Sequence, residues 1–180
     1  MQLDAGADLL YVNTGPGRDD PAGDMVWLVR TIQDGVDARL SLDSPSFKAQ
    51  QAGLKECRHE ALINSTTAEQ KRMEKFLPLA KEHNAEIVCL TINEKGIPNT
   101  VEGRTELAMM LLTTAMDQGI SQEKIYLDGV VLPITAAQDQ CPVLLETITA
   151  LRALSSPPPK TLVGLSNVSS GAEEKSLLNR

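Results

Sequence analysis

The chain has 180 residues, of which 42% are hydrophobic and only 3% aromatic, so it can bury one sizeable core made mainly of aliphatic side chains. The net charge is −7, and Lys and Arg form no cluster, which argues against a nucleic-acid binder because phosphate neutralisation needs grouped cations. The longest uncharged apolar stretch, 107–116, has half the length needed to cross a bilayer, which argues against a membrane protein.

Six short apolar runs alternate with helical patterns along the chain. The runs lie at 8–13, 39–43, 60–64, 86–93, 124–128 and 161–167, and the helical patterns lie at 24–33, 46–55, 68–83, 102–118 and 135–154. Pro78 should bend or interrupt the third helix, since proline lacks the amide that the helix needs. Strands that alternate with helices at this spacing predict βαβ units and a parallel sheet.

Every apolar run ends in Asp or Asn, at intervals of about one βα unit. The six residues are Asn13, Asp43, Asn64, Asn93, Asp128 and Asn167. In a β/α barrel the carboxyl ends of all strands meet on one face, so these side chains would surround one pocket. The alternative is local: Asp and Asn commonly cap helices and begin turns, as Asp43 before Pro45 and Asp128 before Gly129 would do.

Such a ring of polar groups suits a neutral heterocycle. A carboxylate can accept two parallel N–H bonds, and an Asn amide can both donate and accept. An aminopyrimidinone ring such as that of a pterin has this pattern of donors and acceptors. The strand ends therefore favour binding of a pterin-like ring.

Other site chemistries have little support. His59 and His83 are the only histidines, neither has metal-ligand spacing to a cysteine, and we expect no metal site. The turn at 13–17 lacks the lysine of a phosphate-binding loop, and the chain has no nucleophile-elbow motif. The segment 165–171 can present backbone N–H groups to an anion. Three widely spaced cysteines and an N-terminus without basic residues predict a cytoplasmic protein.

At these same residues the sequence resembles the pterin-binding methyltransferases, most closely the methyltetrahydrofolate:corrinoid/iron-sulfur protein methyltransferases. The matching blocks run in order through nearly the whole chain: 5–16, 40–44, 61–66, 90–93 with 96–98, 125–128, 132–133 and 159–169. The same superfamily includes dihydropteroate synthase and the folate module of cobalamin-dependent methionine synthase.

The resemblance implies a homodimeric TIM (β/α)8 barrel of the pterin-binding type. It implies that 5-methyltetrahydrofolate binds in the barrel mouth and passes its methyl group to the Co(I) corrinoid of a separate corrinoid/iron-sulfur protein, in the one-carbon metabolism of the acetyl-CoA (Wood–Ljungdahl) pathway. Carried over to this chain, Asp43, Asn64 and Asp128 contact the pterin, and Asn167 is the catalytic amide near the methylated nitrogen. From their places at strand ends, Asn13 and Asn93 join them as pterin contacts.

Two positions depart from the family pattern. Gly129 stands where the family commonly has proline, which predicts a looser loop after Asp128. Ser170 stands where glutamine is frequent, which removes one polar contact to the ligand.

Three other interpretations stay open. A related enzyme runs the transfer from a methylated corrinoid protein to tetrahydrofolate during methylamine or betaine breakdown, and it uses the same pocket. Dihydropteroate synthase is disfavoured because no basic motif near the C-terminus is visible. A non-catalytic fragment is the third interpretation. A complete barrel needs about 250 residues, so residues 1–180 are expected to be a single incomplete domain that lacks the first strand and the last βα unit.

Overall fold

The computed structural model of the protein describes residues 2–15 and 19–179. Its centre is a six-stranded parallel sheet in which the strands follow chain order. The strands are β1 (Leu9–Asn13), β2 (Arg39–Asp43), β3 (Leu62–Thr67), β4 (Glu86–Leu90), β5 (Ile125–Asp128) and β6 (Lys160–Leu162). Each of the six predicted runs therefore overlaps a strand.

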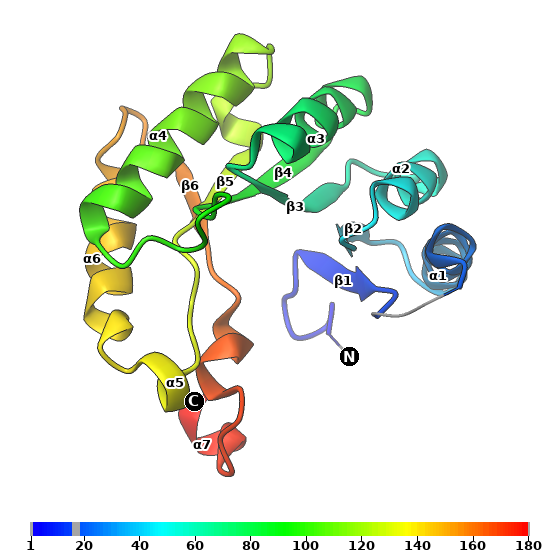
Figure 1. Cartoon of the computed structure of the whole chain (residues 1–180). Helices are drawn as coiled ribbons and strands as arrows, with labels where there is room; N and C mark the ends of the chain where they lie inside the picture. The colour runs from blue at the N-terminus through cyan, green and yellow to red at the C-terminus, as the bar shows by residue number, and fades with distance from the viewer. Residues whose placement is uncertain (1, 16–18, 180) are drawn as a thin grey trace.

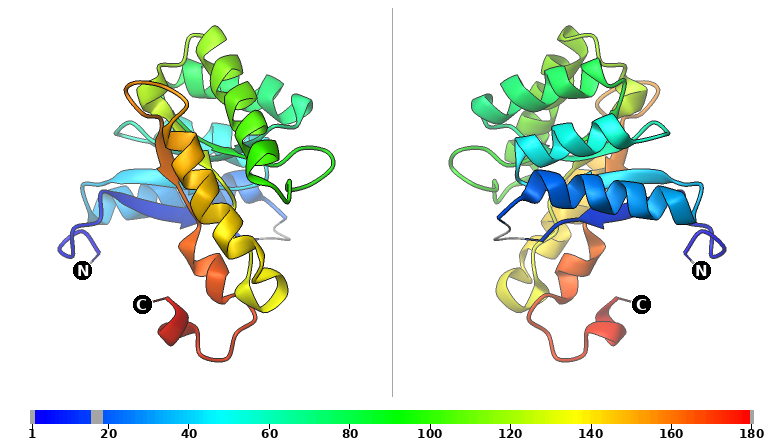
Figure 2. Two further views of the ribbon diagram at one scale, coloured as in Figure 1. Left: turned by 90° about the vertical axis from the view of Figure 1, so that its left-hand side faces the viewer. Right: turned by 90° about the vertical axis from the view of Figure 1, so that its right-hand side faces the viewer.

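The main helices connect consecutive strands and cover the outer face of the sheet (Figure 1). They are α1 (Pro21–Gly35), α2 (Phe47–Glu56), α3 (Gln70–Glu82), α4 (Val101–Asp117) and α6 (Gln140–Arg152). Shorter elements are η1 (Gln122–Lys124), α5 (Ile134–Ala137), η2 (Leu165–Ser169) and α7 (Lys175–Leu178). Figure 2 shows α7 at the C-terminal end, apart from the sheet.

The sheet curls so that its inner face is concave, and β1 and β6 are its edges. This is a partial TIM barrel with six parallel βα units. The alternation of strands and helices predicts the parallel βα units, and the sequence resemblance implies the barrel. Its core is aliphatic, with fully buried side chains such as Leu42, Ile63, Ile87 and Leu127. No helix in the described ranges is long and apolar enough to cross a membrane.

The helix caps test the alternative that the strand-end Asp and Asn residues cap the following helices. Asp20 caps α1 by accepting a hydrogen bond from Gly23 N at 2.9 Å, and Ser46 caps α2 in the same way through Ala49 N at 3.3 Å. Thr100 is the corresponding residue of α4. The predicted alternative that Asp43 caps a helix is therefore wrong, and its carboxylate is left for other contacts.

The turn alternative holds at other strand ends. The side-chain oxygens of Asn13, Asn93 and Asp128 each accept a hydrogen bond from the amide two residues later, at 2.5, 2.9 and 2.7 Å. Such bonds are typical of Asp and Asn in turns. Each of these side chains keeps further hydrogen-bonding capacity, so the turn role does not exclude contact with a ligand.

Three predicted strand ends are misplaced. β3 continues through Asn64 to Thr67, with a register irregularity against β4 between Ile63 and Thr66. β4 ends at Leu90 and β6 at Leu162, because both pair in register with Asp128, where β5 itself ends. A strand stops where its neighbour can no longer supply hydrogen bonds.

Two helix predictions also need correction. The pattern at 135–154 forms two helices, α5 and α6, and Pro142 lies in the first turn of the second, where its missing amide is tolerated. The helix α3 runs through Pro78 without interruption, although proline was expected to bend or break it. Leu77 and Leu79 on either side are buried in the core, and this packing offsets the one lost backbone hydrogen bond.

Candidate functional site

A cavity of about 600 Å³ opens on the concave side of the sheet, at the carboxyl ends of the strands. This volume is in the range of small-molecule sites. Four of the six predicted site residues line it: Asp43, Asn64, Asp128 and Asn167. Apolar walls come from Leu9, Leu62, Leu90 and Leu162, and further polar groups from Tyr11, Ser41, Ser65 and Ser166. None of the described lining residues is Lys, Arg or His, so the cavity suits a ligand that donates hydrogen bonds rather than an anion.

Asp128 is the most buried ionisable group of the cavity, with 6% of its surface exposed. Burial raises the pKa of Asp128 to about 6, although the hydrogen bond from Val130 N to Oδ1 opposes the rise. Among the described residues Oδ2 has no hydrogen-bond partner, so it is available to a ligand. A carboxylate in such a place gains from any N–H donor that enters the cavity.

Asp43 is held from the β1 side. Its Oδ2 accepts hydrogen bonds from the Tyr11 hydroxyl and from Asn13 Nδ2, the latter at 2.7 Å. Asn13, Asp43 and Asn64 lie side by side in the register of β1, β2 and β3. Asn13 does not line the cavity itself, and it acts on the site through Asp43. Two donors on one oxygen leave Oδ1 as the atom that Asp43 presents to a ligand.

Asn64 lies at the irregular step of β3, where the strand register shifts. Its backbone carbonyl accepts a hydrogen bond from Gln50 Nε2 at 3.0 Å. The same Nε2 donates to the carbonyls of Leu42 at 2.8 Å and Ser44 at 3.4 Å, on either side of Asp43. Gln50 is fully buried, so one side chain from α2 fixes the ends of two strands that carry site residues.

Asn167 reaches the cavity from η2 rather than from the end of β6. Its backbone makes the turn bond to Gly164 O at 2.9 Å, and its residue surface is exposed. Within the described ranges, the side-chain amides of Asn64 and Asn167 contact no hydrogen-bonding partner. Both amides are therefore available to a ligand, and Asn167 lies on a segment outside the sheet.

Two predicted site residues do not line the cavity: Asn13, which contacts Asp43, and Asn93, which contacts none of the other predicted site residues within the described part of the chain. Asn93 lies three residues beyond β4, in a small bridge with Gly96.

The other candidate chemistries considered from the sequence are a metal site, reactive thiols and the segment 165–171. Within the described ranges, no three His, Cys, Asp or Glu side chains are grouped to hold a metal ion. Burial raises the pKa of Cys57 to about 11 and that of Cys89 to about 12, so both thiols stay protonated at neutral pH. The segment 165–171 folds largely as the short 3-10 helix η2, whose Asn167 and Ser166 face the cavity.

Sequence reasoning missed three residues that shape the site. Tyr11 precedes Asn13 by two positions on the same strand, and this alternation is the signal that places both on one side. Gln50 and Arg104 gave no signal. Gln50 acts from α2 on backbone carbonyls at the ends of β2 and β3, and Arg104 acts from α4 on backbone carbonyls of the loops after β4 and β5. Gly129, predicted to loosen its loop, has its carbonyl bound by Arg104 Nη1 at 3.0 Å.

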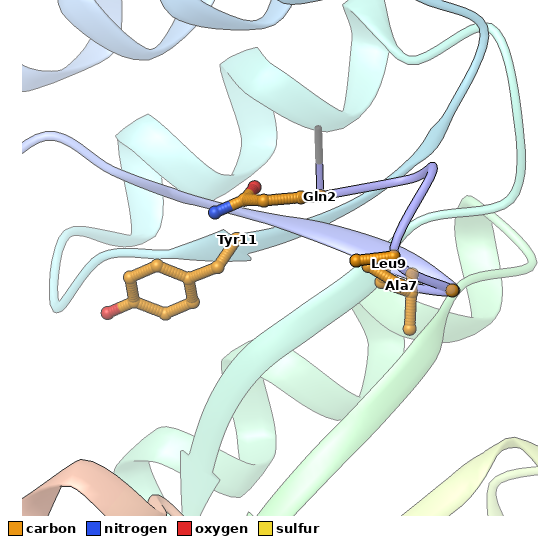
Figure 3. A pocket seen from close by; sticks show the side chains of 6 residues that line it. Gln2, Ala7, Leu9 and Tyr11 are labelled. Atoms are coloured by element: carbon orange, nitrogen blue, oxygen red, sulfur yellow. The ribbon is translucent and has the colours of Figure 1, made fainter.

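A second cavity, of about 540 Å³, lies beside the edge strand β1. Figure 3 shows its lining by Gln2, Ala7, Leu9 and Tyr11, with the Tyr11 ring pointing away from the strand. Leu9 and Tyr11 line both cavities, so the two adjoin at β1. No charged side chain lines this second cavity within the described ranges, and it has no chemistry of its own.

Comparisons with known proteins agree on one family. The sequence profile of the pterin binding enzymes matches residues 1–178. The chain is 28% identical to a methylcorrinoid:tetrahydrofolate methyltransferase of Eubacterium limosum over 99% of its length, and it spans 66% of that protein. It is 32% and 34% identical to the methionine synthases of Mycobacterium tuberculosis and Mycobacterium leprae, over 86% and 94% of its length, and it spans 14% and 15% of those proteins.

Among solved structures, the fold is similar to that of Yersinia pestis DHPS with a pterine–sulfa conjugate. The TM-score is 0.66 with 18% sequence identity, over 93% of this chain and 66% of that one. This likeness shows the fold. With the profile match over nearly its whole length, the chain belongs to the family of pterin-binding enzymes.

Proposed function

We propose that the cavity binds the pterin ring of a tetrahydrofolate, and that the enzyme moves a methyl group between that folate and the corrinoid cobalt of another protein. One observation carries the proposal: Asp43, Asn64 and Asp128 come from three different strands and meet in one cavity without a cation among its described lining residues. The likeness to the methylcorrinoid:tetrahydrofolate methyltransferase of Eubacterium limosum supports it.

The hydrogen-bond acceptors and donors of the cavity match those of an aminopyrimidinone ring. Above its pKa of about 6 the Asp128 carboxyl is ionised, and its Oδ2 can accept N–H bonds from the exocyclic amine and the adjacent ring nitrogen. The Asn64 amide supplies a donor for the ring carbonyl and an acceptor for a further N–H. Asp43 adds one acceptor through Oδ1. The leucines that line the cavity cover the apolar faces of the ring.

Asn167 acts on the methylated nitrogen in this proposal. When methyl leaves the folate, the cobalt supplies the electron pair of the new Co–C bond, and the N–C bonding pair returns to the nitrogen. That nitrogen becomes basic and takes a proton from solvent. The Asn167 amide, which is free of other partners in the described ranges, hydrogen-bonds this developing N–H. A preorganised polar group at such a position contributes about 2.7–4 kcal/mol of transition-state stabilisation.

Direction and partner rest on the relatives and the resemblance. The name of the Eubacterium limosum protein gives tetrahydrofolate as the methyl acceptor. The sequence resemblance gives 5-methyltetrahydrofolate as the donor and a corrinoid/iron-sulfur protein as the partner. Both directions use the same atoms, so we propose a reversible transfer. The partners to test are a corrinoid/iron-sulfur protein, as methyl acceptor, and a methylated corrinoid protein, as methyl donor. We also propose a cytoplasmic homodimer that needs no bound metal of its own.

Binding is tested first, by calorimetry of the full chain with 5-methyltetrahydrofolate and with tetrahydrofolate. We expect saturable binding that is lost in Asn64→Ala and Asp128→Ala. Asn99→Ala and Asp117→Ala are matched controls, because both residues are exposed and lie outside the cavity. A folded wild-type chain that binds neither folate contradicts the proposal.

Turnover is tested separately, with cob(I)alamin plus 5-methyltetrahydrofolate and with methylcobalamin plus tetrahydrofolate, followed by each corrinoid protein. Methyl transfer in either direction that depends on Asn167 supports the proposed reaction. Folate binding without transfer to any corrinoid acceptor would assign this chain to the non-catalytic alternative. A chelator should leave the rate unchanged.

A further inference from the structure

Arg104 is a cation at the centre of the loops beside the candidate site, and it is fully buried. It lies in the first turn of α4, and its guanidinium contacts neutral oxygens alone. Nε donates to Pro98 O at 2.8 Å, Nη1 to Gly129 O at 3.0 Å and Val130 O at 3.5 Å, and Nη2 to Gln140 Oε1 at 2.9 Å. Buried arginines are usually paired with a carboxylate. Here three backbone carbonyls of two loops and one amide take that place.

Two of those carbonyls belong to the segment 128–130, in which every backbone carbonyl is held. The carbonyl of Asp128 accepts hydrogen bonds from Thr91 N at 3.0 Å and Thr91 Oγ1 at 3.1 Å. Val130 N donates to Asp128 Oδ1 at 2.7 Å, and Arg104 binds the carbonyls of Gly129 and Val130.

The segment also has an unfavourable backbone conformation. Val130 has a φ of 64°, in the left-handed region that a β-branched residue rarely adopts. Such a conformation persists where the surroundings determine it. The helix α6 approaches from the other side, since a Cβ added at Gly129 would lie 3.0 Å from Leu144 Cδ1. The bonds from Arg104 to the carbonyls of Gly129 and Val130 are among the contacts that oppose relaxation of Val130.

We propose that Arg104 is a positioning residue: it fixes the segment 128–130 so that Val130 N–H points at Asp128 Oδ1 and leaves Oδ2 facing the cavity. The value of this arrangement for ligand binding rests on the proposed function. The arrangement itself exists in the free protein. The test is therefore made without ligand, so that failure of positioning and failure of pterin binding give different results.

The experiment follows the titration of Asp128 by NMR of ¹³C-labelled aspartate side chains, with Asp128→Asn to identify its signal. In Arg104→Met the hydrogen bond from Val130 N is lost, and this bond holds the pKa of Asp128 down. We expect the titration midpoint to rise by about half a pH unit or more. We also expect amide exchange at Val130 to accelerate by about tenfold or more. Asp43 and Tyr11 are the other ionisable groups that line the cavity, and neither contacts Arg104.

Arg39→Met is the matched control, because Arg39 is bonded to Glu60 and Glu86 at the opposite ends of the strands. It removes an arginine of the same fold and should leave both readouts at Asp128 and Val130 unchanged. Arg104→Lys keeps the charge without the forked geometry and should give an intermediate midpoint. If Arg104→Met does not fold, the titration midpoint of Asp128 in Arg104→Lys, compared with the wild type, tests the proposal.

Each result has a defined meaning. A midpoint in the folded variant that stays the same or falls contradicts the proposal, as does an equal change in Arg39→Met. Failure of both Arg104 variants to fold contradicts it as well, because the arginine would then serve the whole fold rather than one segment. If the midpoint rises as expected and the wild type binds no folate, Arg104 is a positioning residue and the proposed function is wrong.

Discussion

Asn167 and Asp128, two polar residues of the cavity, differ in burial and in hydrogen bonding. Asp128 is buried at the end of a strand, and its backbone and side chain are both hydrogen-bonded. Asn167 is exposed on a short 3-10 helix, and its side chain is unpartnered among the described residues. A fixed, buried carboxylate suits recognition of a ring that is bound throughout the reaction. An unpartnered amide outside the sheet suits a contact that forms as charge develops.

Replacing Asn167 by alanine should therefore affect the reaction more than the binding. We expect the rate of methyl transfer to fall by about 100-fold, while the folate Kd changes by less than about threefold. Single-turnover transfer to cob(I)alamin and calorimetry measure the two quantities, with Asn99→Ala as the control. Equal losses in rate and affinity would make Asn167 a simple binding residue.

The pH dependence of folate binding should follow Asp128. Its pKa of about 6 means that the carboxyl becomes protonated as the pH falls below that value, and it then accepts fewer N–H bonds. We expect the Kd to increase by about tenfold per pH unit below pH 6. Asp128→Asn should bind weakly at all pH values between 5 and 8. A wild-type Kd that is flat across this range would show that Asp128 does not bind the ligand.

Ionisation of Asp128 favours folate binding but lowers the stability of the fold. The folded state holds the Asp128 proton more tightly than the unfolded chain, so the charged carboxylate destabilises the fold above pH 6. Asp128→Asn keeps an oxygen for the Val130 amide. It should be more stable than the wild type at pH 8, by up to about 3 kcal/mol. The difference should shrink as the pH falls toward 4, as measured by urea unfolding.

At the scale of elements, α2 determines how the ends of β2 and β3 meet. Gln50 from this helix donates to carbonyls of both strands, while its own Oε1 is buried without a partner in the described ranges. A glutamate at this position would aim a buried negative oxygen at three carbonyls. We expect Gln50→Glu to destabilise the protein by about 3 kcal/mol. Gln50→Met should cost about 1 kcal/mol.

Urea unfolding of the two variants checks this prediction. Lys48→Gln on the exposed side of the same helix serves as the control. If the glutamate variant is no less stable than the methionine variant, the contact between α2 and the two strand ends is unimportant. The methionine variant should still weaken folate binding, because Asp43 and Asn64 lose a common support.

Element type was predictable from the sequence, whereas several element ends were not. Leucine and isoleucine runs placed all six strands because burial on both faces of a parallel sheet needs continuous apolar sequence. The end of β4 depends on its pairing with β5, and β5 is 35 residues further along the chain. No local pattern carries that information. Asn93 was thus predicted at the cavity and lies in a loop beyond it.

On the scale of the whole molecule, the two ends of the partial barrel have different chemistry. The carboxyl ends of the strands carry the cavity. The amino ends carry a cluster around Glu86, which is 4% exposed and accepts hydrogen bonds from Arg39 at 2.6 Å, Lys160 at 3.1 Å and Tyr126 at 3.2 Å. These partners come from β2, β5 and β6, so the cluster joins strands across the concave face.

Glu86 should contribute to stability above the acidic range. Burial by itself raises the pKa of Glu86, but the hydrogen bonds from Lys160 and Arg39 outweigh it and hold the pKa below its usual value. Its contribution is therefore present at neutral pH and is lost as the pH falls below about 4. We expect Glu86→Gln to cost about 2 kcal/mol at pH 7. The deficit should shrink at acidic pH.

Urea unfolding at pH 7 and at pH 3.5 measures the effect, with the exposed Glu123→Gln as the control. An equal deficit at both pH values would mean that packing, rather than charge, makes Glu86 important. Folate affinity at pH 7 should stay at the wild-type value, because the cluster lies at the far ends of the strands from the cavity.

By itself the sequence determined the alternation of strands and helices, the parallel sheet, the aliphatic core and the polar residues near the strand ends, because apolar periodicity and residue type act over short stretches of chain. Only the tertiary structure decided which polar side chains share a cavity. It also revealed that Tyr11, Gln50 and Arg104 hold the surroundings of Asp43, Asn64 and Asp128. These contacts join residues up to 32 positions apart, and they depend on strand register and on backbone carbonyls, which every residue has and no sequence motif distinguishes.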